Sequence, residues 1–519
     1  MKAHFELKSI LQNVNWNEPA SYKKIVGEYL FNDYTLVLDN IEKDTSNISI
    51  KARVKISNQV AGFPEDTFSN RSREIALRDF IARILYAEIN SSDSQTKDNV
   101  KRAYISLEKP GQEIIDRTSV LLDDKFVEIR FKIVLCQINQ DLISELSEDI
   151  IFNDLADIIE NTCIYNSLNK NQLYKHIETS EDADFLRTEL ENLRLIAFVA
   201  QGSLLPRETG DNDFPCKSND ILPFSSPNNL KMDVELPNGG QITGMGIPRG
   251  ITFIAGPKGS GKTTLLDAIG QGIYNHVPGD GREFVVSNPN TVNIRSEPGR
   301  NISGVNISGF IDNLEDDSNI STENGNSDIS IAANIVEAIE VGADVVLIDN
   351  IFISEYIAKS KSIFNEYMVS TILSSDTEIS DYYSLANFIL RIDNYTLEDI
   401  TQAAKDSCSN YEGYSPFGYL AERIPIADSM EALDINLESI DQIISKSQEE
   451  TILDAVNYSK KYMDGKKSFR QVTSLVMLDI GRLGLDVLNP DLAKNYSEFR
   501  KIELAAALNR IKSLKVEHK

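Results

Sequence analysis

The stretch that most constrains this chain is a glycine-rich run at residues 256–264, Gly-Pro-Lys-Gly-Ser-Gly-Lys-Thr-Thr. An apolar run at residues 251–255 precedes it, and apolar residues at helical spacing follow it, so the pattern predicts a strand, a turn and a helix in that order. This context makes the G-x-x-x-x-G-K-[ST] pattern a predicted phosphate-binding loop. The glycines let consecutive backbone N–H groups point at one anion, and the helix adds its partial positive end. The alternative is an ordinary glycine-rich turn. The predicted strand before the run and the predicted helix after it make this alternative the weaker one.

Each residue of this run has an expected part in holding a nucleotide. Lys262 should bring a full positive charge to the outer phosphates, and the Thr263 hydroxyl is placed to hold Mg²⁺. We expect the nucleotide to be bound by Gly256, Pro257, Lys258, Gly259, Ser260, Gly261, Lys262, Thr263 and Thr264.

A second segment predicts another ligand for the Mg²⁺ ion that Thr263 is expected to hold. The continuous apolar run at residues 345–348 is closed by Asp349. Such a run is typical of a buried parallel strand, and a carboxylate at its carboxyl end can be directed at Mg²⁺. The alternative is a core strand with a chance aspartate. The position of the run after a phosphate-binding loop, in a strand–helix pattern, favours a metal-binding role for Asp349 together with Thr263.

Composition limits the classes of partner. The 519 residues include 79 acidic and 52 basic side chains, which gives a formal net charge of −27. This charge counts against broad binding to nucleic acid or to an acidic membrane, although a local basic groove stays open. No stretch approaches the roughly 18 apolar residues of a membrane span, and the first residues have neither a signal nor a transit pattern. We therefore expect an intracellular, cytoplasmic protein with no membrane contact.

The length predicts about three domains. Alternating apolar residues at 49–56 and 126–133 predict strands, and residues 75–85 have helical spacing. Residues 141–160 are expected to form one helix with an acidic outer face, 314–328 a polar low-complexity stretch, and 440–462 a helix. The predicted organisation is an N-terminal α/β domain at 1–200, a linker at 201–227, a nucleotide-binding domain at 228–400 and a mainly helical domain at 401–519.

Several segments in order resemble the family described as predicted ATPases of the ABC class. The segments that carry the resemblance lie at residues 110–120, 197–207, 244–248, 272–283, 294–300 and 503–510. The resemblance implies an α/β fold, with an ABC-type P-loop core between an N-terminal α/β domain and a helical C-terminal part. It implies ATP and Mg²⁺ as ligands and a homodimer that sandwiches ATP, with an unknown protein as the other option for a partner. Some relatives are linked to RNA metabolism, so RNA enters by analogy alone.

Two departures from the family pattern affect the expected chemistry. The family follows its strand-end aspartate with a glutamate that polarises the attacking water, whereas this chain has Asn350. An amide can orient a water but cannot accept its proton. In the signature segment, Ser327 replaces a glycine and Asp328 replaces a hydroxyl residue, so a phosphate would meet a side chain and a negative charge.

These observations leave two hypotheses for the catalytic positions, Lys262 and Asn350. The first is an active ATPase with a nucleotide-driven dimerisation cycle, in which Glu283 or Glu297 serves as a substitute carboxylate. The second is a nucleotide-binding scaffold or switch whose hydrolysis is weak or lost. The three coincident changes, at Asn350, at Ser327 and in the segment after Asp349, favour the second.

Overall fold

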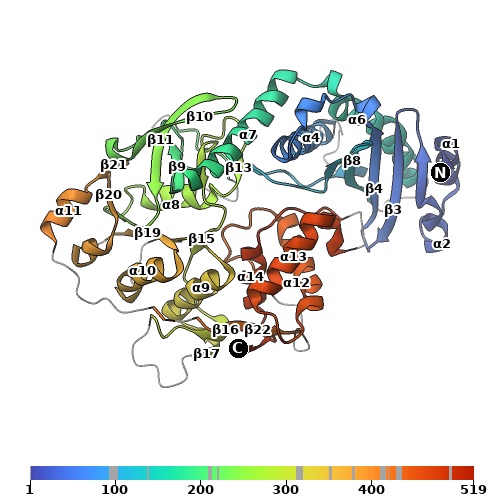
Figure 1. Ribbon diagram of the computed structural model, residues 1–519. Coiled ribbons are helices and arrows are strands. Elements are labelled where there is room, and N and C mark those ends of the chain that lie inside the picture. Colours follow the sequence, from blue (N-terminus) through green and yellow to red (C-terminus); the bar gives the residue numbers. More distant parts are fainter. Residues whose placement is uncertain are drawn as a thin grey trace. The chain divides into compact units, whose positions relative to one another are not determined.

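The computed structural model describes residues 2–92, 103–136, 140–208, 213–218, 221–310, 319–349, 354–376, 380–408, 417–418, 420–427, 430, 435–489 and 494–518. Two compact units divide the chain, and their elements are labelled in Figure 1. Unit 1 consists of Met1–Glu181 and Asn489–Glu498, and unit 2 of Asp182–Leu488 and Phe499–Lys519. No helix among the described residues is both long and apolar enough to cross a membrane.

Unit 1 is built on a seven-stranded sheet with the order β1-β2-β3-β4-β8-β5, in which β7 also pairs with β8. The two long central strands confirm the alternating patterns at 49–56 and 126–133. The strands of this unit are β1 (Lys2–Ala3), β2 (Gly27–Leu30), β3 (Tyr34–Lys43), β4 (Asn47–Ser57), β5 (Ala103–Ser106), β6 (Glu113–Ile114), β7 (Val120–Leu122) and β8 (Phe126–Cys136). The helices are α1 (His4–Asn13), α2 (Pro19–Tyr22), α3 (Asn58–Ala61), α4 (Arg71–Ser92), α5 (Gln140–Asp149) and α6 (Leu155–Cys163), while α7 (Lys170–Asn192) continues into unit 2.

One prediction in this unit needs correction. Residues 141–160 do not form one uniform helix, because a π-helical turn at Ile150–Asp154 separates α5 from α6. Ile150 and Ile151 are both buried in this turn, which changes the helical repeat at the point where two consecutive apolar side chains enter the core.

Unit 2 contains the predicted P-loop core. Its main sheet has the order β15-β18-β19-β12-β20-β21, with the first five strands parallel and β21 antiparallel to β20. Every residue of β12, β18 and β19 is buried, as expected for central parallel strands. The predicted α/β fold with a P-loop is therefore confirmed. The elements of this core are β12 (Ile251–Ala255), α8 (Lys262–Gln271), β15 (Thr291–Ile294), α9 (Ser327–Val341), β18 (Val345–Ile348), α10 (Ser354–Tyr367), β19 (Ser370–Ser375), β20 (Phe388–Asp393) and β21 (Thr396–Asp399).

Further elements of unit 2 surround this core. A four-stranded antiparallel sheet has the order β10-β11-β9-β14, and two strand pairs, β16–β17 and β22–β23, are separate. The strands are β9 (Leu195–Ala200), β10 (Lys231–Leu236), β11 (Gly240–Pro248), β13 (Asn275–His276), β14 (Val285–Ser287), β16 (Arg300–Asn306), β17 (Asn319–Gly325), β22 (Arg423–Ile426) and β23 (Lys515–His518). The helices are α11 (Thr401–Ser407), α12 (Lys446–Ser459), α13 (Phe469–Leu483) and α14 (Lys501–Asn509).

Two predictions in unit 2 differ from the structure. Residues 319–325 of the expected low-complexity stretch form β17, because antiparallel pairing with β16 satisfies the backbone of a polar segment; residues 314–318 lie outside the described residues. The helix expected from residue 440 begins only at Lys446, where the Ser445 side chain caps it by accepting from Gln448 N.

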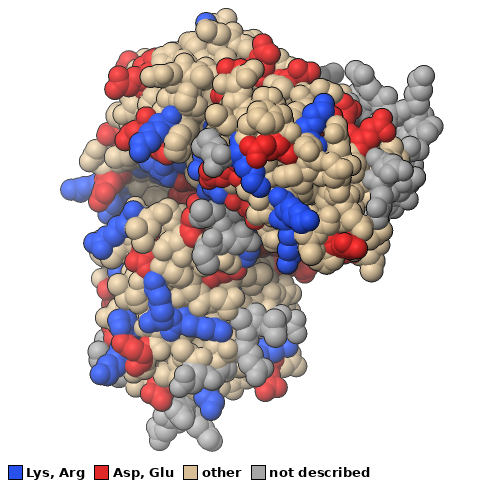
Figure 2. All heavy atoms as spheres, turned by 90° about the vertical axis from the view of Figure 1, so that its right-hand side faces the viewer, with Lys and Arg blue, Asp and Glu red and all other residues tan. Residues whose placement is uncertain are grey.

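Charged side chains of both signs are interspersed on the face of the molecule drawn in Figure 2. The formal net charge of −27 therefore does not appear on that face as one broad patch of a single sign. Mixed charge of this kind is typical of a solvated protein surface.

Candidate functional site

The loop between β12 and α8 has the backbone geometry of an anion-binding loop. Gly256, Gly259 and Gly261 adopt φ values of 157°, 79° and 107°. A Cβ atom on Gly256 would lie 2.2 Å from the carbonyl oxygen of Ile392 in β20, so only glycine fits there. The hydroxyl of Ser260 is buried and has no hydrogen-bond partner among the described atoms. An unpartnered buried hydroxyl in such a loop fits the binding of a phosphate.

Lys262, the first residue of α8, turns its ammonium group back into the loop. Its Nζ atom donates to the carbonyl oxygens of Gly256 at 2.7 Å and Pro257 at 2.9 Å. The same atom forms an ion pair with Asp376 Oδ1 at 2.8 Å, just beyond the carboxyl end of β19. Lys262 is only 4% exposed, so its charge is directed at the loop interior. A triphosphate would compete with Asp376 for this ammonium group.

Three oxygen-bearing side chains meet beside this lysine. Thr263 Oγ1 donates to Asp349 Oδ2 at 2.6 Å, and Ser374 Oγ donates to the other carboxylate oxygen, Oδ1. Thr263 is the second residue of α8, while Asp349 and Ser374 lie at the carboxyl ends of the neighbouring strands β18 and β19. Mg²⁺ in nucleotide sites is commonly held by one carboxylate, a hydroxyl and the phosphates themselves. The residues therefore fit a Mg-nucleoside triphosphate, with Thr263 and Asp349 as the protein's ligands to the ion.

A groove of about 540 Å³ adjoins this cluster. Its lining joins Thr263 and Asp349 to Asp267 of α8, Arg295 after β15, and the first residues of α9, Ser327 and Asp328. Burial raises the pKa of the Asp267 carboxyl, and the positive charge of Arg295 opposes this shift. Arg295 lies 3.6 Å from Asp267 and forms a second ion pair, with Asp441. The charged side chains that line the groove are therefore three aspartates, Asp267, Asp328 and Asp349, and one arginine, Arg295.

Most of the sequence-predicted positions lie together in this part of unit 2. Pro257, Lys258 and Gly259 are exposed at the outside of the loop, and Thr264 is half-buried in the first turn of α8. Asn350 lies outside the described residues.

The suggested substitute carboxylates have other contacts. Glu297 pairs with Arg510 and accepts from Asn334 at 2.9 Å. Glu283 accepts a hydrogen bond from the backbone N–H of Gly279.

Sequence reasoning missed Ser374, Asp376 and Arg295. Ser374 and Asp376 lie at the end of β19, whose sequence, Ser-Thr-Ile-Leu-Ser-Ser, has only two apolar residues and so gives a weak strand signal. These two residues reach the site because β19 lies between β12 and β18 in the sheet, and no local sequence pattern predicts that strand order. Arg295 stands in the segment at 294–300 that carries the family resemblance, but nothing in the sequence placed it beside Thr263 and Asp349.

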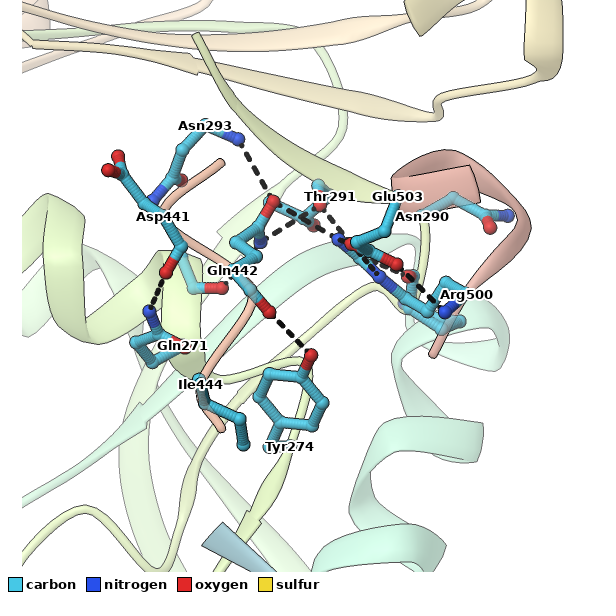
Figure 3. Close-up of polar contacts among 12 residues, drawn as sticks. Gln271, Tyr274, Asn290, Thr291, Asn293, Asp441, Gln442, Ile444, Arg500 and Glu503 are labelled. Carbon is cyan, nitrogen blue, oxygen red and sulfur yellow. Dashed lines mark hydrogen bonds and ion pairs between the residues drawn. The ribbon is translucent and has the colours of Figure 1, made fainter. Parts of the chain in front are cut away.

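A turn at residues 440–443, in the C-terminal part of the chain, is hydrogen-bonded to the C-terminal end of α8 (Figure 3). Gln442 Nε2 donates to the carbonyl oxygens of Gly270 at 2.8 Å and Thr291 at 3.1 Å, and its Oε1 accepts from Asn293 N at 3.2 Å and from Arg500 at 3.1 Å. The neighbouring Asp441 carboxylate holds Arg295. Helix α8 and strand β15, which border the groove of about 540 Å³, are thus connected to residues 441–442.

Comparisons with known proteins agree with this architecture. The chain matches a P-loop domain model named ABC_ATPase over residues 169–416, a model for the N-terminal domain of ATPases of the ABC class over residues 4–166, and the MRB1590 C-terminal domain over residues 428–517. It is 28% identical over 206 residues to the uncharacterized protein MJ1628 of Methanocaldococcus jannaschii. That match covers 38% of this chain and 44% of the archaeal protein, so the similar region spans less than half of the relative.

Proposed function

Because this chain belongs to the family of ATPases of the ABC class, we propose that it binds Mg-ATP at residues 256–264 and acts as a nucleotide-dependent switch or scaffold. The observation that carries the proposal is the 2.6 Å hydrogen bond from Thr263 Oγ1 to Asp349 Oδ2, beside the buried ammonium of Lys262. These groups supply oxygen ligands for a divalent ion and a cation for the outer phosphates. A ligand that binds only one state of a protein stabilises that state. Bound nucleotide can therefore determine which conformation of this protein is available to a partner.

The proposal includes slow or absent hydrolysis. Asn350 follows Asp349 where the family resemblance implies a glutamate, and its amide cannot take a proton from water. Asp328 adds a negative charge to the groove that holds Thr263 and Asp349. A second copy that closed on this groove, as in an ATP-sandwiched homodimer, would bring its phosphate charge toward that carboxylate.

The second candidate function is an active ATPase with a nucleotide-driven dimerisation cycle, for which the family resemblance suggests RNA metabolism as the setting. Asp267 is the observation that favours it. Its carboxyl lines the same groove, and burial raises its pKa, which is the property of a carboxylate suited to accept a proton.

Binding and turnover measured on the same preparations separate these functions. We expect calorimetry to show Mg-ATP binding to the wild-type protein that Lys262→Ala abolishes, with phosphate release near the Lys262→Ala background. Lys446→Ala is the matched control, because Lys446 is an exposed lysine at the start of α12 and does not line the groove beside the loop. Wild-type turnover well above the Lys262→Ala background would refute the scaffold and support the ATPase. A large rise in turnover with Asn350→Glu would show that the missing base limits the reaction.

A further inference from the structure

A tyrosine on the hairpin beside the phosphate-binding loop has a backbone conformation that its turn does not explain. β20 and β21 pair antiparallel through Asp393 and Thr396, so Asn394 and Tyr395 alone form the connecting turn. Both have positive φ, 45° and 61°. Two-residue turns of this kind favour Asn followed by Gly, and a Cβ atom makes the left-handed region costly. Asn394 fits this preference and Tyr395 does not.

The ring of Tyr395 lies against the nucleotide loop and is otherwise open to solvent. Tyr395 is 67% exposed, which is among the highest values for large hydrophobic side chains in the described chain. A Cβ atom on Gly261 would lie 3.1 Å from Cδ1 and 3.8 Å from Cε1 of this ring. Gly261 therefore lacks a side chain at the point where the aromatic ring approaches the loop. The ring contributes little to a core in this position, so packing does not account for it either.

The order of the strands places this ring on the nucleoside side of the loop. In the sheet, β19 and β18 lie on one side of β12, and β20 lies on the other. Ser374 and Asp349, at the ends of β19 and β18, form the cluster with Thr263 that fits the metal ion and the outer phosphates. A triphosphate with its outer end at Asp349 extends its nucleoside end away from β18. Tyr395, just beyond the carboxyl end of β20, lies on that opposite side.

We propose that Tyr395 is the stacking platform for the base of the bound nucleotide, a purine. The inference rests on the proposed function, because it needs a triphosphate in residues 256–264. An exposed aromatic face stacks on any base without reading its hydrogen-bonding edge, and purines offer the larger surface. The site therefore takes ATP and GTP with similar affinity and pyrimidine nucleotides more weakly. The left-handed backbone conformation of Tyr395 costs free energy, and stacking of the base on the ring offsets this cost.

Substitution of Tyr395 by glycine tests this role without endangering the fold, because glycine is the residue that the turn favours. For Tyr395→Gly, calorimetry should show the Kd of Mg-ATP raised about 5- to 150-fold, the range that loss of one base–aromatic stack predicts. The Kd of inorganic tripolyphosphate should stay within about twofold of the wild-type value, since no base is present. Tyr395→Phe keeps the ring and should bind Mg-ATP like the wild type.

Each other outcome is decisive. Unchanged Mg-ATP binding by Tyr395→Gly would overturn the stacking role and leave phosphate binding standing. Equal weakening of ATP and tripolyphosphate would also overturn it, because the ring would then support the loop rather than the base. If the wild-type protein bound neither ligand, the proposed function would fail together with the inference.

Discussion

At the residue scale, Lys262 forms an ion pair with Asp376, so a bound nucleotide must compete with this carboxylate for the lysine ammonium group. The Nζ–Oδ1 distance is 2.8 Å, and the lysine is buried. A phosphate that binds this ammonium must break its ion pair with Asp376, and it then lies close to the displaced Asp376 carboxylate, which repels it. We predict that Asp376→Asn lowers the Kd of Mg-ATP about 3- to 10-fold, because both penalties disappear. Isothermal titration calorimetry measures the change.

Asp376→Glu is the matched control, since it keeps the charge and should stay close to the wild-type affinity. Weaker Mg-ATP binding by Asp376→Asn would contradict the prediction. That result would mean that the carboxylate assists the ligand, for example by holding a water of the metal ion.

At the element scale, Gln442 connects the turn at residues 440–443 to the end of α8 and to β15 through hydrogen bonds. Its side chain is 3% exposed, and it makes four hydrogen bonds to Gly270, Thr291, Asn293 and Arg500. We predict that Gln442→Ala lowers the free energy of unfolding of unit 2 by about 2–4 kcal/mol, because buried carbonyl and N–H groups lose their partners. Scanning calorimetry would show this as a lower transition temperature.

Two further variants sharpen this prediction. Gln442→Glu has the same size but loses both N–H donors, and its new oxygen faces the carbonyls of Gly270 and Thr291. It should destabilise at least as much as alanine. Gln402→Ala, at an exposed position of α11, should stay within about 0.5 kcal/mol of the wild type. If Gln442→Ala behaved like Gln402→Ala, the segment would not depend on this side chain.

The same elements show which parts of the fold and the site can be predicted from the sequence. The apolar runs at 251–255 and 345–348 predict β12 and β18, because central parallel strands need continuous apolar side chains. The phosphate-binding loop and its link to Asp349 follow from these strands. The helical spacing at 440–445 misleads, because residues 440–443 form a single turn in which Ile443 N donates to the carbonyl oxygen of Ile440. Gln442 holds this turn by its hydrogen bonds to distant backbone. Ser374, Asp376 and Tyr395 reach the site through the strand order β18-β19-β12-β20, a long-range property that local patterns do not encode.

At the scale of the whole molecule, 79 acidic side chains outnumber 52 basic ones, and Asp441 is a carboxyl with two further acids, Asp267 and Glu297, in its surroundings. Burial raises the pKa of Asp441 from 3.8 to about 6; the charge of Arg295 opposes the shift, and Asp267 and Glu297 add to it. Because the folded-state pKa is the higher one, the folded protein holds this proton more tightly than the unfolded chain. The stability that Asp441 contributes is therefore complete below about pH 4 and is lost as the pH rises through about 6.

We predict that Asp441→Asn flattens this part of the stability profile. Between pH 5 and pH 7.5 the thermal midpoint of the wild type should fall more than that of the variant, because asparagine has no proton to lose. The comparison uses the slope with pH and not the midpoint itself, because Asp441→Asn also removes the ion pair with Arg295 and so changes the midpoint. Glu450→Gln, which removes an exposed carboxyl from α12, should keep the wild-type slope. Parallel profiles for Asp441→Asn and the wild type would show that Asp441 ionises in the folded protein as easily as in the unfolded chain.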